Sequence, residues 1–477
     1  AWAITTRVFA YTNHTVLPEA LERWSVDLMG RLLPRHLEII YEINDLFLES
    51  VKEKYPDDKD LLQRISFIEE NDHKQIRMPY LSIVGSHTIN GVAELHTELL
   101  KTTIFKDFYK LFPERFQNKT NGITPRLWLR NINPELSELI SKKIGGDWIT
   151  DLQKLRKLEP FADDPEFQEA WRSVKRIKKE QLANWLKQTS GVIIDPESLF
   201  DVQIKRIHEY KRQLLNILHV TYLYNKILKN PELPFVPRTI LLAGKAAPGY
   251  YMAKLIINLA NDVARVINSD PAVQGRLNLV FVPNYNVSVA EKIIPATDIS
   301  QHISTAGTEA SGTGNMKFIL NGALIQGTMD GANIEIAEEV GRENIFTFGL
   351  SSDEVSILAE SGYNPRVSYQ NNPGLIEALS MINTGYFNRD KPHLYNDLYN
   401  SLVFEDKYML LEDFASYDEC RQKVMNTWKD QNTWTRMSIL NTAGSGKFSS
   451  DRTIAEYAKD IWGLEAVTVE LQGKKVR

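Results

Sequence analysis

The pattern of apolar and polar positions predicts mostly helices over the first 120 residues and repeated strand–helix units from about residue 199. In the first part, Leu37, Ile40 and Tyr41 recur at helical spacing, and one apolar run, LSIVG at 81–85, is predicted as a short strand. From residue 199 on, five apolar runs are each followed by a loop and a helical pattern: LFDVQIKRI from 199, TILLAG at 239–244, LNLVFV at 277–282, ALIQGT at 323–328 and IFTFG at 345–349. Strands that alternate with helices favour a doubly wound α/β fold, in which a parallel sheet is covered on both faces.

A long charged helix is predicted to precede these units. Asp164 stands at its start as an N-cap, and Gly191 follows its end as a C-cap. The helix carries a basic run that we interpret as a solvent-exposed face, consisting of Lys175, Arg176, Lys178 and Lys179.

Composition narrows the classes of function. The chain has 477 residues, of which 43% are hydrophobic and 25% charged, and a formal net charge of -5, so no overall field favours nucleic acid or an anionic membrane. Cys420 is the single cysteine, which excludes an internal disulfide and favours a reducing compartment. No apolar run is long enough to span a membrane. The chain starts AWAITT without Met, so we expect a processed terminus or a fragment of a longer sequence.

The most unusual stretch is STAGTEASGTGNMKF, residues 304–318. Gly312, Thr313 and Gly314 open a predicted helix, whose free backbone N–H groups can bind an anion, and Lys317 follows in its first turns. The stretch matches neither the dinucleotide nor the Walker phosphate-loop pattern. A structural Gly-rich turn and an anion or cofactor site therefore both remain open.

A second candidate stretch, QIKRIHEYKR, follows the first strand of the α/β part. Lys205 and Arg206 are predicted to point to opposite faces of the sheet. Lys211 and Arg212 lie at the start of a helix, where cations oppose the helix dipole unless a negative group is present. Bound phosphate would supply that group, and surface charge paired with Glu209 is the alternative.

Two loop carboxylates, Glu309 and Asp330, offer a different chemistry. Glycoside hydrolysis needs two carboxyl groups on either side of the scissile bond, but carboxylates in such loops more often cap backbone N–H groups. The nine histidines form no H-E-x-x-H motif or comparable cluster, so we predict no metal site.

Several long motifs closely resemble glycogen and α-glucan phosphorylases, the enzymes of glycogen, starch and maltodextrin breakdown. They are AYTNHTVLPEALE at 10–22, NKTNGITPR at 118–126, KRIHEYKRQLLN at 205–216, AGKAAPGY at 243–250, EASGTGNMKF at 309–318 and GKFSSDRTI at 446–454. Members of that family are nearly twice as long, so the resemblance implies the C-terminal part of such an enzyme. Residues 1–121 would be the end of the N-terminal domain and 122–477 the Rossmann-like C-terminal domain of a glycosyltransferase-B fold.

The resemblance also implies a role for individual residues. Lys317 would hold pyridoxal 5'-phosphate as a Schiff base, with Thr313, Gly314 and Lys205 at the cofactor phosphate. Arg206 and Lys211 would hold the substrate phosphate. The remaining matched positions would contact or line the sugar site: Glu309, Ser311, Gly312, Asn121, His14, Tyr210, Tyr285 and Trp128, with Tyr250 at the mouth of the cleft.

The implied activity is phosphorolysis of α-1,4-glucan by inorganic phosphate to glucose 1-phosphate with retained configuration, with the cofactor phosphate as proton donor and acceptor. The family implies a homodimer for the full-length protein and a cytoplasmic or plastid setting.

The Gly-rich loop that contacts the phosphates in the family lies in the missing N-terminal part, so we expect residues 1–477 alone to be inactive. The alternatives are a sugar-nucleotide glycosyltransferase of the same fold, a pyridoxal-dependent aminotransferase, or an inactive carbohydrate-binding fragment.

Overall fold

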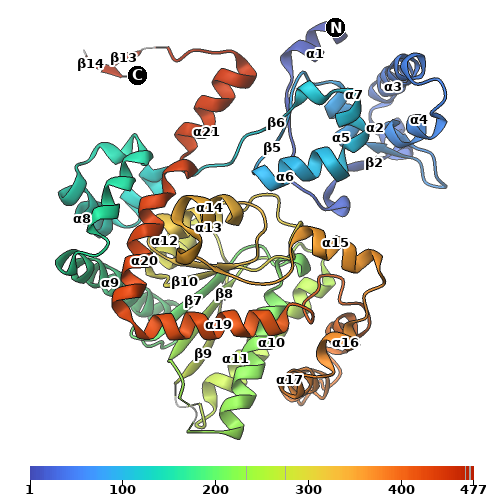
Figure 1. The fold of residues 1–477 in the computed structure, drawn as a ribbon. Helices are drawn as coiled ribbons and strands as arrows, with labels where there is room; N and C mark the ends of the chain where they lie inside the picture. The colour runs from blue at the N-terminus through green and yellow to red at the C-terminus, as the bar shows by residue number, and fades with distance from the viewer. Residues whose placement is uncertain (233, 274, 468, 472–473, 477) are drawn as a thin grey trace. The chain divides into compact units, whose positions relative to one another are not determined.

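The chain forms two compact units in the computed structural model, which describes residues 1–232, 234–273, 275–467, 469–471 and 474–476. Unit 1 combines residues 1–121 with 452–477, and unit 2 consists of residues 122–451. Figure 1 shows the course of the chain through each unit.

Unit 2 is built on a six-stranded parallel sheet with the strand order β12-β11-β10-β7-β8-β9. The strands are β7 (Leu199–Ile204), β8 (Arg238–Ala243), β9 (Leu277–Val282), β10 (Ile299–His302), β11 (Leu324–Gly327) and β12 (Phe346–Thr347). Three strands follow each other outward from β7, and the next three follow outward from β10 on the other side. This order confirms the predicted doubly wound arrangement, and its direction reverses between β7 and β10.

Helices cover both faces of this sheet, as successive residues of β8 show. Ile240 and Leu242 pack into one apolar cluster and Leu241 and Ala243 into the other, because side chains alternate along a strand. The first face is covered by α10 (Gln213–Lys229), α11 (Tyr251–Ser269), α17 (Pro373–Asn383), α18 (Asn396–Asn400) and α19 (Phe414–Lys429). The second face is covered by α8 (Pro134–Ile144), α9 (Pro165–Ser190), α12 (Val287–Ala296), α13 (Gly314–Leu320), α14 (Asn333–Val340) and α20 (Gln431–Ala443).

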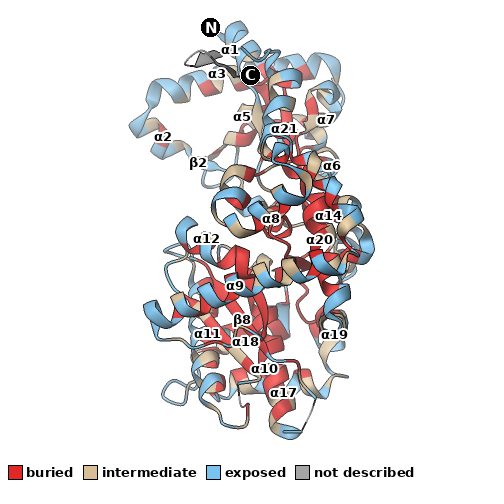
Figure 2. Cartoon of the chain, turned by 90° about the vertical axis from the view of Figure 1, so that its left-hand side faces the viewer, coloured by how far each residue is buried: buried red, intermediate tan, exposed pale blue. Residues whose placement is uncertain are grey.

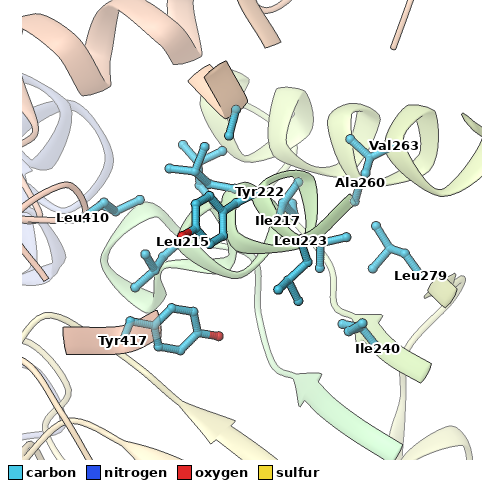
Figure 3. Close-up of a cluster of buried hydrophobic side chains, with 14 of the residues drawn as sticks. Leu215, Ile217, Tyr222, Leu223, Ile240, Ala260, Val263, Leu279, Leu410 and Tyr417 are labelled. Carbon is cyan, nitrogen blue, oxygen red and sulfur yellow. The ribbon is translucent and has the colours of Figure 1, made fainter. Parts of the chain in front are cut away.

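The sheet lies in the buried interior of unit 2, as the burial colours of Figure 2 show for β8 and the helices around it. All six positions of β7 and of β8 are buried. On the first face, Figure 3 shows Ile217 and Leu223 of α10 near Ala260 of α11 and Leu279 of β9. This rigid, doubly covered sheet supports the loops that follow its strands.

Helix α9 has the predicted caps but not the predicted solvent face. Asp164 accepts from backbone N–H groups of the first turn, and Gly191 ends the helix with a φ of 70°. In the basic run, three lysines are held by the protein and only the side chain of Arg176 is largely exposed, at 66%. Lys178 pairs with Glu135, Lys179 pairs with Asp298 at 2.7 Å, and Lys175 donates to the carbonyls of Pro295, Thr297 and Asn321.

Unit 1 contains two small sheets within residues 1–121, and its C-terminal segment adds the antiparallel pair β13 (Val469–Leu471) and β14 (Lys474–Val476). Of the two small sheets, one is parallel, in the order β1-β5-β6, and the other is antiparallel, in the order β2-β4-β3. Their strands are β1 (Tyr11–Thr12), β2 (Arg23–Ser25), β3 (Ile68–Glu69), β4 (Gln75–Arg77), β5 (Ile89–Gly91) and β6 (Phe116–Asn118). The helices are α1 (Trp2–Val8), α2 (Val26–Leu32), α3 (Pro34–Lys54), α4 (Lys59–Ile65), α5 (Met78–Val84), α6 (Glu94–Leu99) and α7 (Lys106–Leu111).

The strand predicted at 81–85 is wrong, because residues 81–84 belong to α5 and Gly85 is its C-cap residue. Pro79 occupies the first turn of this helix, where its missing N–H costs nothing. The strand of this region is β5, which lies between β1 and β6.

The C-terminal segment differs from the expected division of the chain, since residues 452–477 group with unit 1 rather than with unit 2. Arg452 and Thr453, in α21 (Ser450–Tyr457), donate to the carbonyl of Thr120 at 2.5 and 3.0 Å. Further on, the hydroxyl of Tyr457 accepts from Asn90 at 2.9 Å.

In the part of the chain that the structure describes, no helix has the length and hydropathy needed to cross a membrane.

Candidate active site

The two stretches singled out in the sequence meet at one edge of the large sheet. Residues 205–212 follow β7 and residues 303–313 follow β10, the two strands between which the strand order reverses. In open α/β sheets, ligands bind beyond the carboxyl ends of the strands at such a reversal. The candidate site of unit 2 is therefore placed by the topology of the fold.

Arg212 ties these two loops together and is not available to a ligand. Its backbone is left-handed, with a φ of 55°, and its side chain is 0% exposed. The guanidinium donates to the carbonyls of Ile303 and Ser304 at 2.6 and 3.2 Å and forms an ion pair with Asp413 at 2.7 Å. The negative group expected beside Arg212 is thus a carboxylate of the protein.

Lys211 pairs with Glu309, which joins the β7 loop to the β10 loop. Tyr210 donates to the same carboxylate over 3.4 Å, and the Lys211 ammonium lies 4.5 Å from the Tyr210 ring centroid. Burial raises the pKa of Glu309, but the charges of Lys211 and Lys205 outweigh burial and lower it below its usual value. Glu309 is therefore an ionised carboxylate at neutral pH. Glu209, the alternative partner, instead accepts from Tyr250 at 2.6 Å.

Asp330 organises the loop after β10. Its two carboxylate oxygens accept from the hydroxyl of Ser304 at 2.7 Å and from the backbone N–H groups of Gly307, Glu309 and Gly331 at 3.0, 2.9 and 3.0 Å. Burial nevertheless raises the pKa of Asp330 to about 6. Asp330 caps backbone donors, so it does not form a hydrolytic carboxylate pair with Glu309.

Lys205 donates to Nδ1 of His302 over 3.2 Å, and Nε2 of this histidine lies 2.8 Å from the hydroxyl of Ser300. Burial, followed by the charge of Lys211, lowers the pKa of Lys205 to about 7. Burial, followed by the charges of Lys205 and Lys211, holds the pKa of His302 well below its usual value, so the ring is neutral and accepts from the lysine. His302 was not predicted from the sequence, because no strand was predicted at 299–302 and the strand β10 that ends at this residue was missed with it.

The start of α13 lies against this histidine. A Cβ atom at Gly314 would lie 3.6 Å from Cε1 of His302, and the His302 and Phe318 rings are 5.8 Å apart. Thr313 is the N-cap residue, and its side chain makes no cap hydrogen bond, whereas Oδ1 of Asn315 accepts from the backbone N–H of Met316 at 3.0 Å. Lys205 and the first turn of α13 are therefore linked through one side chain.

Lys317 projects from α13 onto Trp128. Its ammonium lies 3.8 Å from the ring centroid of Trp128, a buried residue of the π-helix Arg126–Asn131. Burial lowers the pKa of Lys317. Within the described residues this amine has neither a hydrogen bond nor a carboxylate partner. Tyr285 packs against the same apolar cluster as Trp128.

The other predicted residues of unit 2 lie in the same two loops. Ser311 is buried and its carbonyl accepts from Ala332 at 2.8 Å, and Gly312 has a φ of 76°, which favours glycine. Arg206 is exposed, and its guanidinium forms no hydrogen bond or ion pair with any residue that the structure describes. Arg206 is therefore free to bind an anion.

His14 and Asn121 belong to unit 1, at the carboxyl ends of its parallel strands β1 and β6. His14 is exposed, and the backbone N–H of Asn121 donates to the carbonyl of Val92 at 3.1 Å. Beside them, His96 is buried and hydrogen-bonded to Asn13 at 2.9 Å, and burial lowers the pKa of His96 to about 4.

Among the described residues, no group of three or more His, Cys, Asp or Glu side chains is placed to hold a metal ion.

Comparison with known proteins gives one consistent result. A family model described as carbohydrate phosphorylase matches residues 1–464. The glycogen phosphorylase of Synechocystis is 55% identical over 472 residues, covering 99% of this chain and 56% of the relative. The liver form of glycogen phosphorylase from Bos taurus is 54% identical over 471 residues, and the muscle form from Homo sapiens is 55% identical over 465 residues. These alignments cover 99% and 98% of this chain and 55% of each relative, so the chain spans just over half the length of its curated relatives.

Proposed function

The chain belongs to the carbohydrate phosphorylase family, and from this premise we propose that it carries the catalytic half of an α-1,4-glucan phosphorylase that releases glucose 1-phosphate with retained configuration. The observation that carries the proposal is the pairing of two features in unit 2. One is an amine without an acidic partner, Lys317, and the other is the cationic group of Lys205 and Lys211 at the strand-order reversal. Two phosphates, one on a cofactor and one from the substrate, match this arrangement.

The residues present fit pyridoxal 5'-phosphate. Lys317 offers an amine whose pKa is lowered by burial, as a carbonyl-reactive lysine requires, and Trp128 offers an aromatic face beside it. Lys205 is a partly buried lysine that forms no ion pair with a carboxylate of the described residues, and it is adjacent through His302 to the start of α13. Lys205, Thr313 and Gly314 would hold the cofactor phosphate. When bound, the cofactor supplies a phosphate group that exchanges a proton with inorganic phosphate.

The substrate phosphate would be held by Arg206 and Lys211. Arg206 is exposed and unpaired, so it can turn to an incoming anion without breaking a protein contact. Lys211 is neutralised by Glu309, and this pair keeps the ammonium positioned between the two loops. Positive charge fixed in a partly buried site stabilises anions that develop or approach there. We assign Glu309, Ser311, Gly312, Tyr210 and Tyr285 to the sugar site.

Further parts of the proposal rest on family membership alone. We propose that unit 2 and unit 1 correspond to the C-terminal domain and to the end of the N-terminal domain of a glycosyltransferase-B fold. His14 and Asn121 would bind the sugar 6-hydroxyl. A homodimer of the full-length protein and a cytoplasmic or plastid setting stay predictions.

Reduction of the cofactor-treated protein with borohydride, followed by peptide mapping, tests the proposal directly. A pyridoxyl group on Lys317 supports it. Absence of the modification, or its presence only at exposed lysines such as Lys254, favours a sugar-nucleotide glycosyltransferase or a carbohydrate-binding protein. Release of glucose 1-phosphate from glycogen and phosphate by the full-length protein is the second requirement, and transamination of an amino acid instead would favour the aminotransferase alternative.

A further inference from the structure

The side-chain amide of Asn321 links the two residues of the proposed cofactor contact. Asn321 is the C-cap residue of α13 and is 0% exposed. Its Nδ2 donates to the main-chain carbonyl of Trp128 at 2.6 Å and to that of Lys317 at 2.9 Å. Trp128 and Lys317 are the residues whose ring centroid and ammonium lie 3.8 Å apart. One buried amide therefore joins the backbone that carries the amine to the backbone that carries the aromatic face.

The carbonyl of Trp128 needs a side-chain donor because the helical register changes across it. The backbone N–H of Ile132 donates to the carbonyl of Leu127 at 3.3 Å, in the i+5 pattern of a π-helix. The next N–H, that of Asn133, donates to the carbonyl of Leu129 at 3.0 Å, in the i+4 pattern of an α-helix. The carbonyl between these two acceptors receives neither N–H, and a buried carbonyl without a donor is costly. The amide at the end of α13 supplies that donor.

The carbonyl of Lys317 is passed over in a similar way at the end of α13. In a regular α-helix it would accept from the backbone N–H of Asn321, but that N–H donates to the carbonyl of Phe318 at 3.0 Å. The following N–H, that of Gly322, donates to the carbonyl of Ile319 at 3.0 Å. The side chain of Asn321 thus replaces its own backbone N–H as the partner of Lys317.

Asn321 is itself held from several sides. Its Oδ1 accepts from Nδ2 of Asn133 at 3.0 Å, which turns Nδ2 of Asn321 toward the two carbonyls. Its main-chain carbonyl accepts from the ammonium of Lys175 at 3.0 Å. Gly322 then continues the chain with a φ of 71°, at a place where a Cβ atom would lie 2.6 Å from the hydroxyl of Ser438. Every hydrogen-bonding group of Asn321 has a partner, so the orientation of its amide is fixed.

We propose that Asn321 is a positioning residue, which holds the amine of Lys317 at the indole face of Trp128 for attachment of the cofactor. This inference rests on the proposed function, in which the amine forms a C=N bond to the aldehyde carbon of pyridoxal 5'-phosphate and the aldehyde oxygen leaves as water with the two amine protons. Reacting atoms must be held close and aligned, and Asn321 fixes the two backbones that set this geometry. The residues assigned to the cofactor phosphate lie before Lys317, so binding of the phosphate does not require the amide.

Two ligands of the full-length protein, freed of cofactor, test this role. Pyridoxal 5'-phosphate can form the bond with Lys317, whereas pyridoxamine 5'-phosphate has an amine in place of the aldehyde and binds only noncovalently. Asn321→Leu keeps the branched shape and removes both donors. It should slow attachment of pyridoxal 5'-phosphate, followed by visible absorption, by at least about 10-fold. The Kd of pyridoxamine 5'-phosphate, measured by calorimetry, should stay within about 2-fold of its value in the unaltered protein.

Thr442→Val is the matched control. The hydroxyl of Thr442, a 0% exposed residue, donates to the carbonyl of Ile319 at 3.0 Å, so this variant removes a buried hydrogen bond to the same helix without a change at Trp128. It should keep the rate of attachment. Equal slowing in both variants, or a loss of pyridoxamine 5'-phosphate affinity in Asn321→Leu, overturns the proposal, because either result shows a general loosening of α13.

Asn321→Ser decides the question if Asn321→Leu does not fold. Its hydroxyl can donate to only one of the two carbonyls, so attachment should be at least about 3-fold slower, and an unchanged rate overturns the proposal. Peptide mapping of the unaltered protein after borohydride reduction separates this inference from the proposed function. Without a pyridoxyl group on Lys317 both fail, whereas a modified Lys317 together with unchanged rates in the variants refutes only the role of Asn321.

Discussion

Nζ of Lys205 lies 3.2 Å from Nδ1 of His302, so that the residue after β7 and the last residue of β10 share a hydrogen bond where the strand order reverses. The opposite ring nitrogen of His302 is fixed by Ser300 at 2.8 Å. The histidine thus holds Lys205 from one side and contacts the start of α13 on the other. The lysine is oriented by a neutral group, which leaves its charge for an anion.

This relationship predicts that His302→Leu weakens the binding of pyridoxal 5'-phosphate by about 10- to 100-fold, the value of one hydrogen bond to a charged group. His302→Asn keeps an acceptor near the position of Nδ1 and should lose much less. Both affinities are measured by spectroscopic titration. Pyridoxal, which lacks the phosphate, is the matched control ligand, and its affinity should be equal in the two variants. A loss shared by pyridoxal and its phosphate would show a general disruption of the pocket and contradict this role for His302.

Lys317→Ala is expected to abolish covalent attachment of the cofactor. The amine has no hydrogen bond or carboxylate partner in the described part of the chain, so its loss leaves no unpaired acid behind and the fold should remain intact. The measurement is the visible absorption of the bound cofactor, supported by circular dichroism as a check of folding. Lys254→Ala, a change at an exposed lysine of α11, is the control and should keep the absorption. A Lys317→Ala protein that retained the absorption would refute the assignment.

Arg206→Ala should raise the phosphate concentration needed for half-maximal activity of the full-length protein by at least about 10-fold, with cofactor content unchanged. The guanidinium is exposed and has no protein partner, so the substitution removes an anion ligand and little else. Initial rates at varied phosphate and fixed glycogen measure the effect. Arg436→Ala, which breaks a surface ion pair with Asp163, serves as the control. An unchanged phosphate requirement would remove Arg206 from the substrate site.

Five of the six strands of the large sheet and the two candidate loops were predictable from the sequence because they depend on local signals, whereas the short strand β10 was not predicted. Apolar runs such as 239–244 and 277–282 gave the strands, and a parallel α/β sheet places ligands at the loops after them. Asp164 and Gly191 likewise gave the ends of α9 through capping chemistry. The prediction at 81–85 failed because a mostly apolar run of five residues fits a short strand and one turn of a helix equally well.

The partners of individual side chains were not predictable, because they come from distant parts of the chain. Arg212 is neutralised by Asp413, and Lys179 is neutralised by Asp298, although sequence neighbours favour a phosphate partner and a solvent-exposed face. The contact of His302 with Lys205 depends on the pairing of β7 with β10, which only the strand order reveals. Local pattern therefore locates the site, and long-range packing decides which of its charges are free.

Asp330→Asn tests whether a carboxylate is required to hold the loop after β10. All four groups bonded to Asp330 are donors, and an amide would turn its own N–H donors toward some of them. We therefore expect the variant to bind glucose 1-phosphate at least about 10-fold more weakly at pH 7, because Glu309 loses its backbone anchor.

The free energy of unfolding of Asp330→Asn and of the unaltered chain should depend on pH in different ways. The folded-state pKa of Asp330 is raised to about 6, so the stability that its protonated form contributes is present below the unfolded-state pKa and is lost as the pH rises through 6. Between pH 4 and pH 7, the free energy of urea unfolding should thus shift in favour of Asp330→Asn over the unaltered chain by about 2 kcal/mol. A difference in unfolding free energy that stayed constant over this range would show that Asp330 does not titrate with a raised pKa.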